Sequence, residues 1–452
     1  MEAPPRRPAL AVRAGDSPIG FRVPAGRHPS PFSPEPAAGA PSLRALFLAL
    51  LVAGLPAGHS VAADGSSGAP GAAGPADGRG EIVLAAGGDV TLGARLEEHL
   101  QALAIQDGTL DPHGYPFARI AHHLRGADLA LVNLEGPFTR RGIRLPKNFN
   151  FRASPHLAAA LSRAGIGAVS LANNHVMDYG AAGLQDTLAA LAGEGIAGFG
   201  AGATLPAARR GVVVERRGMR IGLLGYLFLG DNSIEPPAIF AGPGRPGVAG
   251  HPRSAAAVEA MVRQDVASLR PRVDALVISF HWGREKRYEP EGYQRRLGRA
   301  AVDAGAQVVV GHHPHVIQGI EAYRGGLIAY SLGNFVFGGK WRPDDTDAIL
   351  LKVRLRPSPA AATAARWWAP ALPTAASPPG AGFGGRPGGA AVAGYEVVPL
   401  ALGIYPDAPF QPVELAGEDA ARLRARLEAS SRGLGAGGQG PERSGGLSAK
   451  SR

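Results

Sequence analysis

Residues 306–315, AQVVVGHHPH, change within a few positions from an aliphatic run to a loop rich in histidine. Short β-branched runs that end at a glycine and alternate with helical segments are typical of buried strands in a parallel sheet. Gly311 ends this run, and three histidines follow it around Pro314. Three imidazoles within four residues would be an odd choice for a structural loop. The stretch therefore predicts a strand with a functional site at its carboxyl end.

Four other apolar runs end in the same way, each next to polar side chains that can bind a metal ion. In an open parallel sheet, ligands bind outside the carboxyl ends of the strands. We therefore expect side chains that are spread over more than 200 positions to meet at one edge. Asp89 follows the run IVLAA, and Asn133 with Glu135 follows DLALV. Asn173, Asn174 and His175 follow AVSLA, and His281 follows ALVISF.

Carboxylates, amides and imidazoles without a thiolate form a mixed nitrogen and oxygen ligand set. Such a set suits one or two divalent ions such as Mn, Fe or Zn, and it favours a metal-dependent hydrolase. Metal–ligand bonds are about 2.0–2.2 Å long. A carboxylate oxygen of Asp89 or Glu135 should therefore lie within about 5 Å of an imidazole nitrogen of His313 or His315.

Each cluster taken alone also has a structural interpretation. Asp89 stands before an expected helix and could be its N-cap. Residues 133–136 could form an ordinary turn, and His281 could be a hydrogen-bonded residue at a strand end. The joint occurrence at five strand ends favours the metal site.

The formal charge of +10 does not indicate nucleic-acid binding. Residues 1–63 carry six arginines against three acidic residues, and the chain from Ser431 onward carries four basic residues against one acidic residue. The body between them has an excess of only +4, without a basic stripe or interleaved aromatic residues. There is no cysteine, so the fold must be held by its core and its metals rather than by disulfides.

A targeting signal is expected near the N-terminus. LRALFLALLVAGL (43–55) is an apolar run that is too short for a comfortable membrane span, and small residues at 61–63 match a secretory cleavage site. This predicts export of the body to the periplasm or cell envelope. The alternative is an uncleaved anchor, which would be the protein's contact with the membrane.

Apolar periodicity predicts the helices of the body, and composition divides the chain into six segments. Six helices are expected in the body, at 94–105, 115–125, 155–164, 181–192, 254–269 and 291–304, and a hairpin is expected across Arg217-Gly218. The segments are a disordered leader (1–63) with a secretory signal near 43–63, a flexible linker (64–80), the main domain (81–356), a low-complexity loop insertion (357–394), returning strands and a terminal helix of the same domain (395–432), and a disordered tail (433–452).

Several motifs, in this order and spacing, resemble the CapA family of capsule biosynthesis. They are GDVTLG (88–93), NLEGPFT (133–139), SLANNHVMDYG (170–180), FHWG (280–283), GHHPHVIQGIE (311–321) and YSLGNFVF (330–337). That family is similar to the calcineurin-like metallophosphoesterases, and the resemblance covers roughly residues 82–340. It implies an α/β fold, a metallophosphoesterase sandwich of two mixed β-sheets flanked by helices.

The resemblance also implies roles for individual residues. It makes His175 the catalytic residue, a general acid, and it places Glu285 and Asn334 around the pocket. Lys147 and Arg144, in RGIRLPKNF, could attract an anionic substrate or could be solvated loop charges. The implied metal ligands are Asp89, Glu135, Asn174, His281, His313 and His315.

Two positions depart from the superfamily pattern. Thr91 stands where the first motif usually has histidine, and Glu135 stands where the bridging acid is usually aspartate. One metal position thus loses an imidazole ligand.

The expected function is that of an exported CapA-like protein of capsule or poly-γ-glutamate biosynthesis. Its metal-dependent hydrolase-type site would act on an anionic polymer or ester, beside membrane proteins of capsule synthesis. Two alternatives remain open. One is a non-catalytic envelope component that binds or exports the polymer, and the other is a secreted metallophosphatase.

Overall fold

The computed structural model describes residues 80–106, 108, 111–231, 233–340, 343–358, 389–403 and 409–434. The predicted leader and its signal, most of the linker, most of the insertion and nearly all of the tail lie outside these residues. Within the described part of the chain, no helix is both long and apolar enough to cross a membrane.

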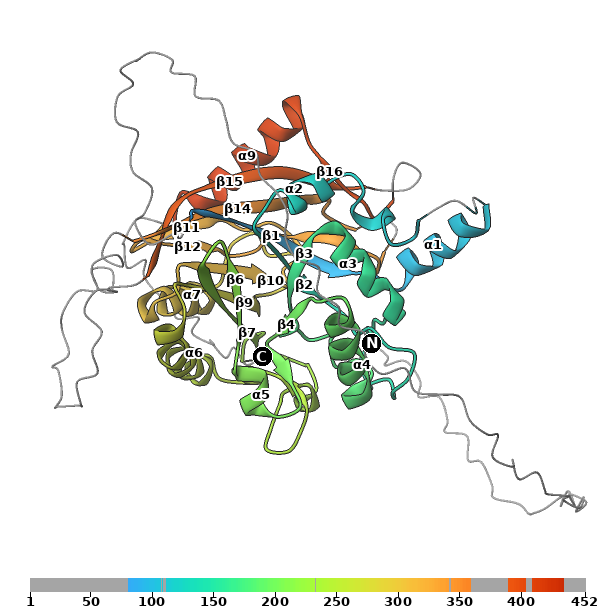
Figure 1. Ribbon diagram of the computed structural model, residues 1–452, viewed down its shortest axis with the longest axis horizontal. Coiled ribbons are helices and arrows are strands. Elements are labelled where there is room, and N and C mark those ends of the chain that lie inside the picture. Colours follow the sequence, from blue (N-terminus) through green and yellow to red (C-terminus); the bar gives the residue numbers. More distant parts are fainter. Residues whose placement is uncertain are drawn as a thin grey trace, which may run out of the picture. The chain divides into compact units, whose positions relative to one another are not determined.

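The described body is built on two mixed β-sheets, as the sequence predicted (Figure 1). The first sheet has the order β16-β15-β14-β1-β2-β3-β4, with β13 beside β1. Its members are β1 (Ile82–Thr91), β2 (Leu129–Leu134), β3 (Ile166–Ser170), β4 (Ala197–Phe199), β13 (Asn334–Phe337), β14 (Asp347–Pro357), β15 (Ala390–Leu402) and β16 (Pro412–Glu414). Strands β1 to β4 are parallel, and β14 to β16 extend the sheet in antiparallel fashion.

The second sheet has the order β11-β12-β10-β9-β7-β6. It consists of β6 (Val212–Arg216), β7 (Met219–Phe228), β9 (Ala275–Trp282), β10 (Val308–His312), β11 (Ile320–Tyr323) and β12 (Gly326–Ala329). Four central strands are parallel and the two edge strands antiparallel. The β6–β7 hairpin across Arg217-Gly218 confirms the prediction. A small separate pair is formed by β5 (Ala201–Gly202) and β8 (Gly247–Val248).

Helices cover the outer faces of the two sheets, and the inner faces pack on each other. Successive side chains of a strand point to opposite faces, and those on the inner faces form the inter-sheet core. Examples are Leu84 of β1, Leu223 of β7 and Val310 of β10. The first sheet carries α1 (Arg95–Gln106), α2 (Ala121–Arg125), α3 (Ala158–Ala164) and α4 (Gly180–Gly193), and the second carries α6 (Ala255–Leu269) and α7 (Gly292–Ala304). The remaining helices are α5 (Leu205–Arg209), α9 (Gly417–Ser431) and the 3₁₀ turns η1 (Tyr115–Phe117), η2 (Pro155–Leu157), η3 (Pro237–Ile239) and η4 (Arg270–Arg272).

The predicted helix 115–125 is wrong as a single element. The structure has the turn η1, then a break, and then the short helix α2. The side chain of Gln411 donates a 2.6 Å hydrogen bond to the carbonyl oxygen of Tyr115. In a continuous helix that oxygen would accept from the amide of Arg119, whose side chain instead bonds Gln411. Contact with the C-terminal segment therefore overrides local helix propensity.

The predicted boundary of the loop insertion at residue 394 is also wrong. Strand β15 begins at Ala390, five residues before the expected start at 395, and pairs with β14 from Pro357 onward. Alanine and glycine have low strand propensity, so the segment 390–394 does not read as a strand. Backbone pairing with β14 and a bulge opposite Arg354 and Leu355 place it in the sheet.

Both sheets end their parallel strands at the candidate site. In the first, Asp89 of β1 is in register with Asn133 of β2. In the second, His281 of β9 is in register with His312 of β10. Gly311 allows the close approach, since a Cβ there would lie 1.9 Å from the carbonyl oxygen of Tyr330.

Candidate metal centre

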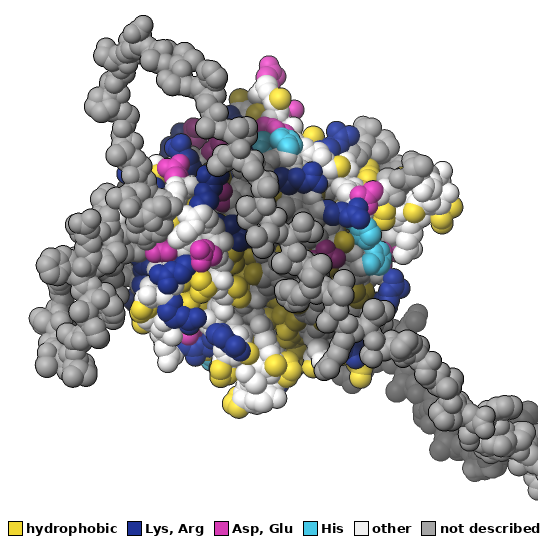
Figure 2. Space-filling view, viewed as in Figure 1, with side chains coloured by type: hydrophobic (Ala, Val, Ile, Leu, Met, Phe, Trp, Pro, Cys, Tyr) yellow, Lys and Arg dark blue, Asp and Glu magenta, His cyan; other side chains and the backbone are white. Residues whose placement is uncertain are grey.

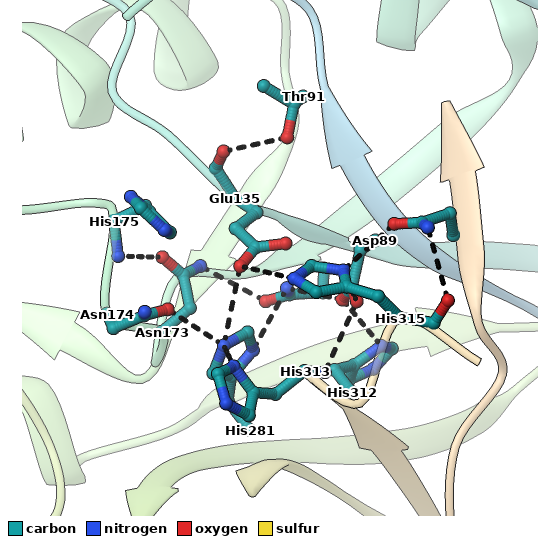
Figure 3. Close-up of polar contacts among 12 residues, drawn as sticks. Asp89, Thr91, Glu135, Asn173, Asn174, His175, His281, His312, His313 and His315 are labelled. Carbon is teal, nitrogen blue, oxygen red and sulfur yellow. Dashed lines mark hydrogen bonds and ion pairs between the residues drawn. The ribbon is translucent and has the colours of Figure 1, made fainter. Parts of the chain in front are cut away.

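Five of the predicted ligands meet in one cluster, and all but His315 are buried (Figure 3). Asp89 lies near the end of β1, Glu135 follows β2, and His281 lies near the end of β9. His313 and His315 follow β10 in a tight loop, where both have positive φ angles of 95° and 56°. Such backbone angles are costly for non-glycine residues, and they often occur where a site must aim its side chains. Here the loop brings the imidazole of His315 toward Asp89 and Glu135, and that of His313 toward Glu135 and His281.

One group of three potential ligands consists of Glu135, His281 and His313. The Nε2 atom of His281 lies 3.1 Å from Nδ1 of His313 and 3.5 Å from Oε1 of Glu135. The amide oxygen Oδ1 of Asn174 is 2.9 Å from the same Nε2. Potential ligand atoms from three other strand ends thus lie 2.9–3.5 Å from Nε2 of His281.

A second group consists of Asp89, Glu135 and His315. The Nδ1 atom of His315 lies 3.3 Å from Oδ2 of Asp89, and its Nε2 atom lies 3.9 Å from Oε1 of Glu135. Both distances are within the limit predicted from the sequence. Glu135 belongs to both groups, so it holds the position of a bridging ligand.

The burial and hydrogen bonding of Glu135 indicate whether a cation fits between these ligands. Its side chain is fully buried, and neither carboxylate oxygen has a hydrogen-bond partner among the described residues. Burial, followed by the charge of Asp89, raises the pKa of Glu135 to about 8. A buried carboxylate without a partner is unfavourable, and a divalent cation would supply the missing charge. The donors fit a divalent metal.

The neighbouring histidines and Asp89 differ in the direction in which their pKa values are shifted. Burial lowers the pKa of His281, and burial together with the charge of His315 lowers that of His313 to about 3, so both rings are neutral at pH 7. Burial disfavours the charged form of His315, but Glu135 and Asp89 outweigh it and raise its pKa to about 10. Burial likewise opposes the ionised form of Asp89, yet the imidazoles of His312 and His315 hold its pKa well below the usual value.

His175 occupies a different position from the ligands. Its Nδ1 atom lies 2.8 Å from Oδ2 of Asp178, and its ring packs 4.4 Å from that of Phe151. Burial lowers the pKa of His175 despite the opposing effect of Asp178. The residue lines a cavity of about 780 Å³ together with Asn174 and His313. His175 therefore lies beside the candidate metal centre and faces the same cavity.

The predicted substrate-binding residues divide into two sets. Lys147 and Glu285 line the cavity. Arg144 is exposed and is not one of the described residues that line the cavity, so the structure does not bring it to the site. Asn334 contacts His315, with Oδ1 2.9 Å from Nδ1, and so touches a potential ligand rather than the open space. On one face of the molecule, basic side chains are interspersed with acidic and apolar ones (Figure 2).

Thr91, which stands where the superfamily's first motif usually has histidine, contacts the backbone of Glu135 (Figure 3). Its hydroxyl donates to the backbone oxygen of Glu135 at 3.2 Å and so supports the loop rather than the cluster. His312, which was not among the predicted ligands, lies beside the cluster. It is fully buried, its Nδ1 atom is 3.4 Å from Oδ1 of Asp89, and neither nitrogen has a hydrogen-bond partner in the described part of the chain.

Two other contributors were missed, and both are carboxylates that hold site residues. Asp178 follows His175 by three positions, within the quoted motif SLANNHVMDYG, so the spacing was a usable signal. Glu235 accepts from Nδ2 of Asn174 at 2.9 Å, but it comes from the loop after β7, in the other sheet. The local sequence around Glu235 gave no indication of this contact.

A mixed two-sheet sandwich flanked by helices, with potential metal ligands at converging strand ends, is consistent with a metallophosphoesterase-like fold. The family model described as "Bacterial capsule synthesis protein PGA_cap" matches residues 83–339, which is more than half of the chain. The chain belongs to this family, as the sequence motifs indicated.

Known relatives carry capsule-related names. The chain is 31% identical over 277 residues to the "Capsule biosynthesis protein CapA" of Bacillus anthracis, covering 60% of this chain and 62% of that protein. It is 33% identical to the "PGA biosynthesis protein CapA" of Bacillus subtilis strain 168, covering 50% and 57% of the two chains. It is 36% identical to a "Probable polyglutamine synthesis accessory protein" of Mycobacterium tuberculosis, covering 46% and 55%. The match thus spans less than two thirds of each relative's length.

Among solved structures, that of a hypothetical protein from Thermus thermophilus aligns with a TM-score of 0.35 and 15% identity. The alignment covers 60% of this chain and 93% of that chain.

Proposed function

We propose that this protein serves capsule or poly-γ-glutamate biosynthesis through a metal-dependent hydrolase-type site that acts on an anionic polymer or ester. The observation that carries the proposal is the buried Glu135 carboxylate. It lacks hydrogen-bond partners among the described residues and is shared by two groups of potential ligands. Family membership and the names of the relatives support the biological setting.

The residues that would hold one or two divalent ions are those of the cluster. A divalent ion such as Mn, Fe or Zn, when bound, would supply Lewis-acid chemistry by polarising a carbonyl or phosphoryl oxygen. The ligand set is Asp89, Glu135, Asn174, His281, His313 and His315.

His175 would transfer protons to and from the substrate. Asp178 fixes its Nδ1 atom, which leaves Nε2 to exchange a proton with a substrate in the cavity. The lowered pKa leaves the imidazole neutral at pH 7. His175 would therefore first act as a general base and then, once protonated, as a general acid toward the leaving group. The sequence predicted only the general-acid role.

The direct test uses purified full-length protein loaded with Mn²⁺. A generic phosphodiester and poly-γ-glutamate are offered side by side, with metal-depleted protein and the His175→Ala variant as controls. Mn²⁺-dependent cleavage of either compound that is lost in His175→Ala supports the proposal, and the compound cleaved identifies the bond. Absence of cleavage of both, in protein that has bound Mn²⁺, would refute it.

A non-catalytic role in polymer binding or export is the second candidate. The observation that favours it is Thr91, which turns its hydroxyl to a backbone oxygen where the superfamily has an imidazole. Mn²⁺-dependent retention of poly-γ-glutamate without cleavage would support this role.

We also propose that the body is exported to the periplasm or cell envelope and works there beside membrane proteins of capsule synthesis. The apolar run at 43–55 and the small residues at 61–63 support this. N-terminal sequencing of protein from the envelope fraction tests it, and a full-length cytoplasmic product would contradict it.

A further inference from the structure

A single lysine connects the loops after three strands around the candidate metal centre. Lys147 lies after β2, Asn174 and Asp178 lie after β3, and Glu235 lies after β7. The Nζ atom of Lys147 donates to the carbonyl oxygen of Asn174 at 2.6 Å. It also lies 2.9 Å from Oδ1 of Asp178 and 3.2 Å from Oε2 of Glu235. Two of these contacts are hydrogen bonds, and the contact with Asp178 is an ion pair, since Oδ1 of Asp178 has no hydrogen-bond partner among the described residues. The side chain is only 9% exposed, and its charge is matched by these two carboxylates.

Each of the two carboxylates held by this lysine also holds a residue of the site. The second oxygen of Glu235 accepts from the Nδ2 group of Asn174 at 2.9 Å. The second oxygen of Asp178 accepts from Nδ1 of His175 at 2.8 Å. One ammonium therefore fixes two carboxylates, and through them one predicted metal ligand and the predicted proton-transfer residue.

The contact between Glu235 and Asn174 decides which atom of the amide faces the cluster. A carboxylate only accepts, so it keeps the NH₂ group of Asn174 on its own side. The amide oxygen then points the other way, 2.9 Å from Nε2 of His281. A flipped amide would put an NH₂ group where a cation has to bind and would place two oxygens against each other at Glu235.

We propose that Lys147, with Glu235 and Asp178, is a positioning residue that orients Asn174 and His175, and that it does not bind substrate. This inference rests on the metal site proposed above. It replaces the role in substrate attraction that the sequence predicted for Lys147.

The test is Mn²⁺ affinity, measured by titration calorimetry on metal-depleted full-length protein. The Lys147→Met variant keeps the length of the side chain and removes the charge. Simple electrostatics predicts tighter binding of a cation once a nearby positive charge is gone. Loss of positioning predicts the opposite, a loss of about 10- to 100-fold, which is typical when a group that orients a ligand is removed. Lys286→Met is the matched control, because Lys286 pairs with Asp344 and its replacement removes the same charge without touching Asn174.

A double-mutant cycle separates positioning from a general loss of structure. If Glu235 acts through Asn174, Glu235→Ala weakens Mn²⁺ binding in the native background but has no further effect in an Asn174→Ala background. Glu235→Gln retains an acceptor for the amide and should lose less affinity than Glu235→Ala. These variants also answer the question if Lys147→Met does not fold.

Two outcomes overturn the inference while leaving the proposed function intact. One is Mn²⁺ binding by Lys147→Met that equals or exceeds that of the native protein. The other is an equal loss from Glu235→Ala in both backgrounds. If the native protein itself fails to bind Mn²⁺, the proposed function fails, and the inference fails with it.

Discussion

Neutralising Glu135 should stabilise the metal-free protein, although the residue lies at the centre of the site. Its pKa is raised from 4.5 to about 8 by burial and by Asp89. Because the folded state binds this proton more tightly than the unfolded chain, stability falls as pH rises from 4.5 towards 8. At pH 7 the cost is about 3 kcal/mol, and at pH 5 it is only about 1 kcal/mol. Glu135→Gln carries no charge and should recover these amounts.

The assay is thermal unfolding in a chelator at pH 7 and pH 5, followed by the same measurement with Mn²⁺. The variant should melt above the native protein at pH 7, with a clearly smaller difference at pH 5. Mn²⁺ should then raise the melting temperature of the native protein more than that of the variant, because ligand binding to the folded state stabilises it.

A buried carboxylate of the opposite kind provides the control. Asp347 has its pKa lowered by Arg422 and Arg426 despite its burial, so Asp347→Asn should destabilise the protein at pH 7. If Glu135→Gln in the chelator also destabilises the protein at pH 7, or if its effect is the same at both pH values, the reasoning about Glu135 is refuted.

Three further predictions concern metal and proton binding. His281→Ala or His313→Ala should each lower the bound metal measured by elemental analysis, since each removes a ligand; unchanged metal content would contradict the assignment. His175→Ala should keep its metal and lose about 10²- to 10⁴-fold in turnover, and loss of metal would mean that the roles in the Asn-His pair are reversed. Mn²⁺ binding at pH 7 should release at least about one proton from the pair His315 and Glu135, whose pKa values are about 10 and about 8, because ligands bind deprotonated. Affinity should therefore rise with pH above 7, and calorimetric heats that are identical in buffers of different ionisation enthalpy would count against this.

The sheets and the ligand cluster were predictable because they depend on local patterns. An aliphatic run that ends in Gly and His or in Asn and Glu identifies both the strand and the edge where its polar residue stands. The sequence patterns predicted that Asp89, Glu135 and His315 lie at one site. The structure puts the two carboxylates 3.3 and 3.9 Å from the ring nitrogens of His315.

What the sequence did not reveal depends on contacts between distant segments. Helix 115–125 is broken because Gln411 takes the carbonyl oxygen that its first turn needs. Glu235 reaches Asn174 from a loop of the other sheet, 61 positions away along the chain. Lys147 was correctly placed near the cavity, but a loop lysine that contacts substrate and one that ties loops together look the same in sequence.

If the proposed site binds an anionic polymer, the charge of the cavity would make metal loading a condition for that binding. With Lys147 committed to its carboxylates and Arg284 lying 3.2 Å from Glu291, Asp231 and Glu285 are left to dominate the lining. A polyanion approaching this surface without metal would meet net negative charge and be repelled. One or two divalent cations in the cluster would add +2 or +4 beside these groups and reverse the local field. Polymer retention should consequently disappear in a chelator and return with Mn²⁺, and metal-independent retention would mean that the polymer binds elsewhere on the protein.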